Sequence, residues 1–156
     1  MDNNGKNQRR LTSNSGWDDD PNWSPDGTWL VFESSRGGRI DIYKMRVDGS
    51  NLTRLTTEGD LNSTPSWSPD GRLIAFERKS GSTYQIWIMN TDGGNQRQLT
   101  YDGKLNLRPA WSPDGNKIAC NSDRSGVEAI WIIPLDGNAP RRLSPGEGFD
   151  SAWSRH

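Results

Sequence analysis

The chain has 156 residues, of which 30% are hydrophobic, and its 19 basic and 20 acidic residues leave a net charge of −1. This mixed, near-neutral charge gives no field that would attract nucleic acid or an anionic membrane surface. No apolar run approaches the roughly 18 residues of a membrane span, and the first residues lack the pattern of a signal peptide. We therefore expect no nucleic-acid binding and no membrane insertion, and the sequence leaves the compartment open.

The chain begins with a segment that predicts an isolated outer strand. Residues 1–12 align with residues 45–56 and 89–100, and all three segments end in Leu-Thr. Basic residues such as Arg9 and Arg10 precede this pair, as expected for an edge strand, where charge discourages association with another sheet. We interpret residues 1–19 as an outer strand followed by a link.

A repeated unit follows this segment. The motif WSPDG begins at Trp23, Trp67 and Trp111, 44 residues apart, and a shorter WSR begins at Trp153, 42 residues later. Two apolar runs rich in branched and aromatic residues follow each motif, and Asp-Gly pairs separate the runs. Asp-Gly is typical of tight hairpins, because glycine adopts the positive φ that these turns need. A fixed period of this length indicates an array whose units bury their apolar faces against each other.

Each period predicts four short antiparallel strands and no helix, which is typical of a β-propeller blade of about 40 to 50 residues. WSPDG, the runs at 74–76 and 86–89, an Asp-Gly turn and Arg-Gln-Leu-Thr at 97–100 resemble the propeller repeat of TolB and its relatives. The resemblance extends over roughly Met1 to Ser154. It implies an all-β propeller, six blades in the closed ring, and a periplasmic location as one option.

The number of copies predicts an incomplete ring. We read residues 1–156 as one propeller segment with three complete blades, at 20–63, 64–107 and 108–150, and a spare inner strand at 151–156. Propellers use about four to eight blades, so three cannot close a ring. We therefore expect a half-propeller that homodimerises into six blades. The alternative is a fragment, natural or engineered, of a longer TolB-like or peptidase-associated propeller.

Chemistry is expected where the copies differ, in the segments that link one blade to the next. The polar positions that vary there are Asp18, Asp20, Asn62, Thr64, Asn106, Arg108 and Asp150. Because inner strands surround the axis, we predict that these residues lie at one mouth of the central channel and contact a protein or a small polar ligand. Hard carboxylate oxygens make Asp18, Asp20 and Asp150 candidate calcium ligands, and no other cofactor is expected.

Residues that recur in every copy are expected to be structural instead. These are the tryptophans Trp23, Trp67, Trp111 and Trp153 and the aspartates Asp26, Asp70 and Asp114. A carboxylate needed once per unit is best explained by a turn, in which it accepts hydrogen bonds from backbone N–H groups.

Catalysis is not expected. His156, the last residue, is the only histidine, and the sequence has no P-loop and no paired-cysteine zinc motif. The sequence therefore predicts a binding or scaffold module. A propeller that binds a small ligand, a sugar or a metal is the remaining alternative.

Overall fold

The computed structural model describes residues 4–143, which form three four-stranded antiparallel sheets and no helix. Blade 1 contains β1 (Asp18–Trp23), β2 (Trp29–Ser34), β3 (Asp41–Arg46) and β4 (Thr53–Arg54). Blade 2 contains β5 (Leu61–Trp67), β6 (Leu73–Ser80), β7 (Thr83–Asn90) and β8 (Arg97–Gln98). Blade 3 contains β9 (Asn106–Trp111), β10 (Lys117–Ser122), β11 (Ala129–Pro134) and β12 (Arg141–Arg142).

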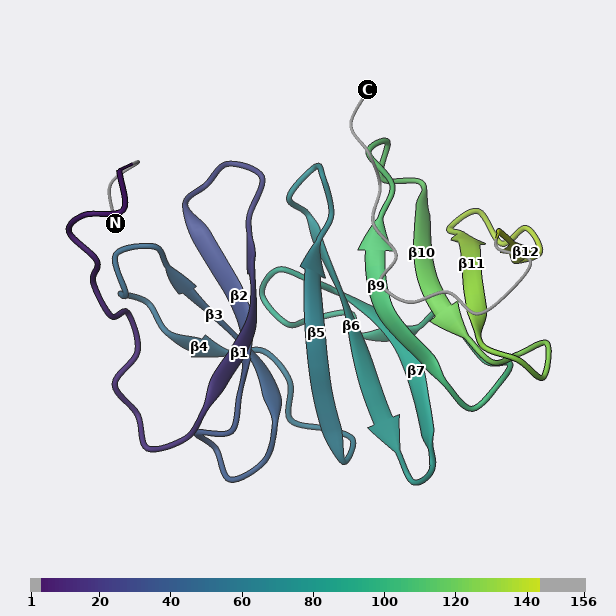
Figure 1. The fold of residues 1–156 in the computed structure, drawn as a ribbon, viewed down its shortest axis with the longest axis horizontal. Coiled ribbons are helices and arrows are strands. Elements are labelled where there is room, and N and C mark those ends of the chain that lie inside the picture. The colour runs from purple at the N-terminus through teal and green to yellow at the C-terminus, as the bar shows by residue number, and fades with distance from the viewer. Residues whose placement is uncertain (1–3, 144–156) are drawn as a thin grey trace.

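The three blades stand side by side in chain order and do not close a ring (Figure 1). Within each blade the strands pair in sequence order, with β1, β5 and β9 as the first strands and the two-residue β4, β8 and β12 as the last. The all-β fold of partial propeller type is thus confirmed. No helix in the described part of the chain is long and apolar enough to cross a membrane.

Two of the three buried clusters in the described residues lie in the seams between blades, and the third lies within blade 1. At the first seam, Val31 and Ile42 of blade 1 share a buried cluster with Trp67, Phe76 and Met89 of blade 2. At the second seam a matching cluster joins blade 2 to blade 3. Each blade therefore depends on its neighbour for burial, as expected for a stacked repeat.

The expected outer strand is absent from residues 4–12, which the structure places outside any strand. Arg9 and Arg10 hold the repeat positions of Thr53–Arg54, which pair with the third strand of their own blade. Among the described residues no third strand precedes Arg9, so this segment has no backbone to pair with. Leu11 nevertheless packs against a buried cluster of blade 1 that includes Phe32. The predicted spare inner strand at 151–156 lies outside the described residues.

The segments expected to be linking loops also differ from the expectation, because the inner strands begin earlier. Asp18 and Asp20 lie in β1, Asn62 and Thr64 in β5, and Asn106 and Arg108 in β9. Each strand carries a register shift at this point, so the polar residues belong to a bulge of the inner strand.

Candidate functional site

A bulge with left-handed backbone recurs at the inner strand of every blade. Asp20, Thr64 and Arg108 have φ values of 46°, 45° and 56°, and a proline follows each of them. Positive φ is uncommon for residues other than glycine and is concentrated at turns and functional sites. The bulge turns these three side chains out of the regular alternation of the strand.

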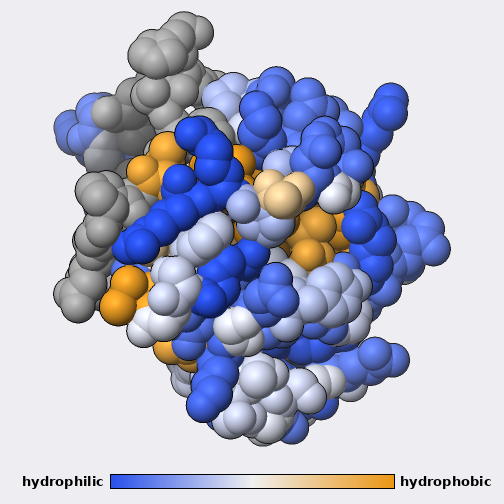
Figure 2. Space-filling model, turned by 90° about the vertical axis from the view of Figure 1, so that its right-hand side faces the viewer, coloured by the Kyte–Doolittle hydropathy of each residue, from blue (hydrophilic) through white to orange (hydrophobic). Residues whose placement is uncertain are grey.

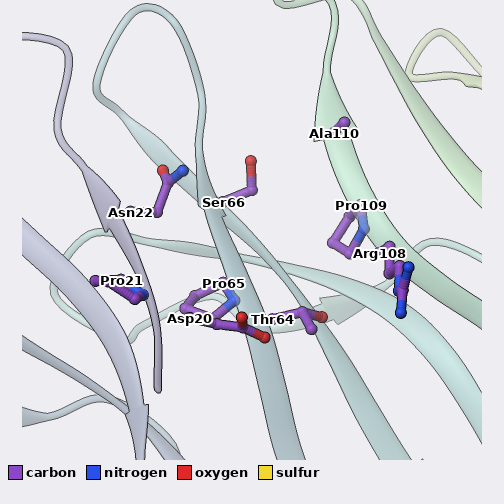
Figure 3. A pocket seen from close by; sticks show the side chains of 9 residues that line it. All are labelled: Asp20, Pro21, Asn22, Thr64, Pro65, Ser66, Arg108, Pro109 and Ala110. Atoms are coloured by element: carbon purple, nitrogen blue, oxygen red, sulfur yellow. The ribbon is translucent and has the colours of Figure 1, made fainter. Parts of the chain in front are cut away.

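The three bulges surround one hollow of about 560 Å³, to which each inner strand contributes three consecutive residues. The lining residues are Asp20, Pro21, Asn22, Thr64, Pro65, Ser66, Arg108, Pro109 and Ala110. Figure 3 shows Asp20, Thr64 and Arg108 along one side of this hollow, from neighbouring strands. The Asp20 carboxylate and the Arg108 guanidinium thus share one concave surface, whereas the Thr64 hydroxyl oxygen is buried. Such a surface suits a ligand that carries both charges or the polar backbone of a peptide.

Two buried glutamates hold the bulges in place across the seams. The Glu33 carboxylate of blade 1 accepts a hydrogen bond from the Thr64 backbone N–H of blade 2 at 2.8 Å. The Glu77 carboxylate of blade 2 accepts one from the Arg108 backbone N–H of blade 3 at 2.6 Å. Burial raises the pKa of both glutamates, and the hydrogen bonds from the bulges oppose this shift only in part.

Asn62 and Asn106 lie away from the hollow, in contrast to the expectation that they face a ligand. Both are fully buried. The Asn62 amide donates to Asp41 Oδ1 at 2.8 Å, and the Asn106 amide donates to Gln85 Oε1 at 3.1 Å. Each asparagine therefore ties the first strand of its blade to the third strand of the preceding blade.

Asp18 is also absent from the lining of the hollow. Its carboxylate accepts hydrogen bonds from Arg36 Nη2 at 2.8 Å and from Asn14 Nδ2 at 2.7 Å. Burial alone would raise the pKa of Asp18, but hydrogen bonds led by those from Ser34 and Arg36 outweigh it and lower the pKa to about 2. Asp150 lies outside the described residues.

Among residues 4–143, no group of three or more His, Cys, Asp or Glu side chains is placed to hold a metal ion. Asp18 is bound to Arg36, whereas Asp20 lines the hollow. Calcium binding through Asp18, Asp20 and Asp150 stays a prediction.

The recurring tryptophans differ in their surroundings. Trp67 and Trp111 are each only 8% exposed, and the Trp111 indole donates to the Ser66 carbonyl oxygen of blade 2 at 3.0 Å. Trp23 is 59% exposed. Trp153 lies outside the described residues.

The recurring aspartates cap their own turns. Asp26 Oδ1, Asp70 Oδ1 and Asp114 Oδ1 accept hydrogen bonds from the backbone N–H two residues later, at 3.0 to 3.1 Å. Each also accepts from the serine hydroxyl of its WSPDG motif. These hydrogen bonds lower the pKa of all three carboxyls.

The sequence reasoning overlooked the glutamates of the seams. Glu33 and Glu77 are 44 residues apart, and Asn121 follows after another 44. Charged residues recurring inside an apolar strand were the available signal, since buried charges need a fixed partner.

Comparisons with known proteins agree with the observed fold. The profile of the TolB beta propeller domain matches residues 1–100 and 63–154. TolB of the Tol-Pal system from Bordetella pertussis is 44% identical over 45 residues, which are 29% of this chain and 10% of that protein. An uncharacterised protein of Agrobacterium fabrum is 50% identical over 42 residues, 27% of this chain and 14% of that protein. The matches thus span about a tenth of these relatives.

Solved structures cover more of the chain. TolB from Acinetobacter baumannii superposes with a TM-score of 0.76 and 30% identity, over 86% of this chain and 34% of that one. The putative TolB from Agrobacterium tumefaciens superposes with a TM-score of 0.73 and 30% identity, over 85% of this chain and 50% of that one. A puromycin-hydrolysing peptidase of Mycobacterium tuberculosis, at 22% identity and a TM-score of 0.71, is similar in fold alone.

Proposed function

This chain belongs to the TolB β-propeller family, and we propose that it is a non-catalytic binding module that works as a six-bladed ring of two copies. The observation that carries the proposal is the contrast among the motif tryptophans. Trp67 and Trp111 are buried against the preceding blade, whereas Trp23, at the same repeat position of blade 1, is 59% exposed. Because the equivalent tryptophans of the other blades are buried, the exposure of Trp23 supports a further blade that packs against it in the assembly.

The opposite end of the array has a matching surface. We call the side of blade 3 that carries Ala119, Asn121 and Ile130 the C-terminal face, and the side of blade 1 at which Trp23 lies the N-terminal face. The residues of the C-terminal face hold the repeat positions of Val31, Glu33 and Ile42. Ile42 is fully buried, but Ile130 is only partly buried. Figure 2 looks onto this end of the molecule and shows hydrophobic residues at the surface among hydrophilic ones.

Two copies would supply each face with the partner that it lacks. A second copy's blade 1 would cover the C-terminal face, and its blade 3 would cover the N-terminal face, so that a two-fold axis closes the ring. The six blades that result are the number implied by the TolB resemblance.

The hollow of Asp20, Thr64 and Arg108 is the binding site of this proposal. In a ring of two copies each of these side chains would occur twice around the channel. Curated relatives are named as proteins of the Tol-Pal system, which makes a protein segment the first ligand class to test and the periplasm the first compartment. A non-catalytic role fits the chemistry, because Cys120 is buried and burial raises its thiol pKa to about 12.

Light scattering coupled to size exclusion tests the assembly. The wild type should have twice the 17.5 kDa chain mass. Trp23→Lys should shift the protein towards the monomer, because it places a charge in the closed seam. Tyr101→Lys, at a residue 74% exposed in blade 2, is the matched control and should stay dimeric. A well-folded wild-type monomer would refute the ring and favour the fragment of a longer propeller.

A further inference from the structure

One polar contact recurs at both internal seams. An acceptor on the second strand of one blade, Glu33 or Glu77, receives the backbone N–H of the bulge in the next blade, at Thr64 or Arg108. The two glutamates lie 44 residues apart, and so do the two bulge residues. Because the acceptor and the donor recur with the repeat, the residues at the same two repeat positions can be identified at the N-terminal and C-terminal faces.

At the C-terminal face the acceptor is present, but its donor is missing. Asn121 of β10 holds the position of Glu33 and Glu77, and the residue is only 1% exposed. Its Nδ2 donates to Glu128 Oε1 at 3.3 Å, whereas its Oδ1 is buried and has no hydrogen-bond partner among residues 4–143. A buried acceptor without a donor costs about 1 to 3 kcal/mol in general, so its persistence points to a partner.

At the N-terminal face the donor is present, but the part of the chain that the structure describes supplies no acceptor from a preceding blade. The bulge residue there is Asp20, whose backbone N–H donates to the neighbouring Asp19 carboxylate at 2.9 Å. This contact is exposed and local, unlike the contacts of Thr64 and Arg108, which cross a seam.

We propose that Asn121 Oδ1 of one copy accepts the hydrogen bond of the Asp20 backbone N–H of a second copy, once in each of the two seams that close the ring. This inference rests on the proposed dimer and assigns the residues that recognise the partner. Each face then provides the group that the other lacks. Because Asn121 is only 1% exposed in the single chain, ring formation must uncover its Oδ1 before the Asp20 N–H can bind there, and the contact then matches those of the internal seams.

The charges at these positions explain why the acceptor is an amide. Glutamate occurs opposite Thr64 and Arg108, which are neutral and cationic at the bulge. Opposite Asp20 and its neighbour Asp19, a glutamate would meet like charge, and like charges across an interface are strongly unfavourable. Asn121 keeps the acceptor oxygen and removes the charge.

A segment of the same chain could compete for this place. Asp150, outside the described residues, stands three positions before Trp153, as Asp20 does before Trp23. We favour the second copy because one added strand would leave Trp23 exposed at the other face, whereas a second copy covers both faces. The variants below distinguish a second copy from the chain's own segment at Asp150.

The test is a charge exchange followed by sedimentation velocity on the full chain. Asn121→Glu should weaken dimerisation by at least about tenfold, because it places a carboxylate against Asp19 and Asp20. Adding Asp20→Arg recreates the Glu77 and Arg108 pairing of the internal seam and should restore the dimer. Asn121→Glu with Asp150→Arg is the matched control and should remain weakened. Ser82→Glu, on an exposed turn of blade 2, controls for added negative charge.

The carboxylate introduced by Asn121→Glu would also repel Glu128, but equally in the single and double variants. Restoration of the dimer by Asp20→Arg therefore measures only the interaction across the seam. If Asn121→Glu fails to fold, a folded dimer of the double variant supports the proposal, and a double variant that is monomeric or unfolded refutes it. A wild-type dimer that Asn121→Glu leaves unchanged overturns this assignment and leaves the ring intact. Rescue by Asp150→Arg instead of Asp20→Arg would assign the place to the chain's own segment. A wild-type monomer would overturn both proposals.

Discussion

The seam between blades 1 and 2 and the N-terminal face of blade 1 are built from the same repeat but are covered differently. In the seam, a whole blade covers Ile74 and Phe76, and Leu55 lies in the same cluster. At the N-terminal face, the equivalent Leu30 and Phe32 are covered in part by Leu11, the counterpart of Leu55. One segment thus helps to bury Leu30 and Phe32 but leaves Trp23 in solvent.

The motif tryptophan therefore has two different roles, one in blade 1 and one in blade 2. The motif tryptophan stabilises a blade only where a preceding blade receives it. In the ring that we propose, the same residue at the N-terminal face stabilises the assembly instead of the single chain. Stability and association should therefore respond differently to the same substitution in blades 1 and 2.

This pair of tryptophans should show the greatest difference in stability. Trp67→Ala should lower the free energy of unfolding by about 3 to 5 kcal/mol, because it opens a cavity in the first seam. Trp23→Ala should cost less than about 1 kcal/mol in a dilute, dissociated chain, where the side chain is mostly exposed. Urea unfolding followed by circular dichroism measures both values. Equal losses for the two variants in dilute solution would mean that the N-terminal face is already covered within one chain.

The fold could be read from the sequence because its signals are local and repeated. WSPDG, the Asp-Gly turns and the alternating apolar runs each determine a short stretch of backbone, and three copies agree. The outer strand at residues 4–12 could not be predicted correctly, because a strand needs a pairing partner that a motif such as Arg-Leu-Thr does not supply.

The candidate site was only partly predictable. The variable positions at Asp20, Thr64 and Arg108 were found, and the structure places them around one hollow. Asn62 and Asn106, two residues earlier, are just as polar but are buried. Residues two apart in a regular strand face the same side, so the bulge is what turns Thr64 and Arg108 away from these asparagines. The bulge decides which side each residue faces, and the proline after each bulge residue was its only visible sign.

A second comparison concerns the buried acceptor on the third strand. In blade 1 the acceptor is Asp41, fully buried and bound to Arg39, Arg54, Thr56 and Asn62, whereas in blade 2 it is the neutral Gln85. Asp41→Ala should lower the free energy of unfolding by about 2 to 3 kcal/mol. This loss is smaller than the loss on breaking a fully buried ion pair, because the Arg39 and Arg54 side chains are partly exposed. Gln85→Ala should cost less, since no charge loses its partner. Urea unfolding at neutral pH measures the two losses, and a smaller loss at Asp41 would contradict the assignment.

The lowered pKa of Asp41 also predicts how the stability of the fold changes with pH. Burial would raise its pKa, but the hydrogen bonds from Arg39, Thr56 and the other partners lower it below the ordinary value. Its stabilisation is therefore fully present above the unfolded pKa near about 3.9 and is lost as the pH falls through the lower folded pKa. Asp41→Asn should lose less stability than the wild type on acidification below about pH 4. An identical acid response in both proteins would contradict this account.

The smallest effect is expected at the glutamate of the second seam. Burial raises the pKa of Glu77, so the fold favours its protonated form, and its contribution improves as the pH falls from 7 towards the unfolded pKa of about 4.3. Glu77→Gln keeps an acceptor for the Arg108 N–H and should change stability at pH 7 by less than about 1 kcal/mol. The difference in unfolding free energy between wild type and variant should shift in favour of the wild type from pH 7 to pH 5. A difference that does not change over this range would show that the carboxylate does not titrate there.

The concentration dependence of unfolding tests whether the N-terminal and C-terminal faces complete each other in a second copy. Because a dimer dissociates as it unfolds, its urea midpoint must rise with protein concentration, and we expect a clear rise between about 1 and about 100 µM. The Trp23→Lys variant should show little or no rise. A wild-type midpoint that stays constant over this range, with the chain folded as a monomer, would contradict the account.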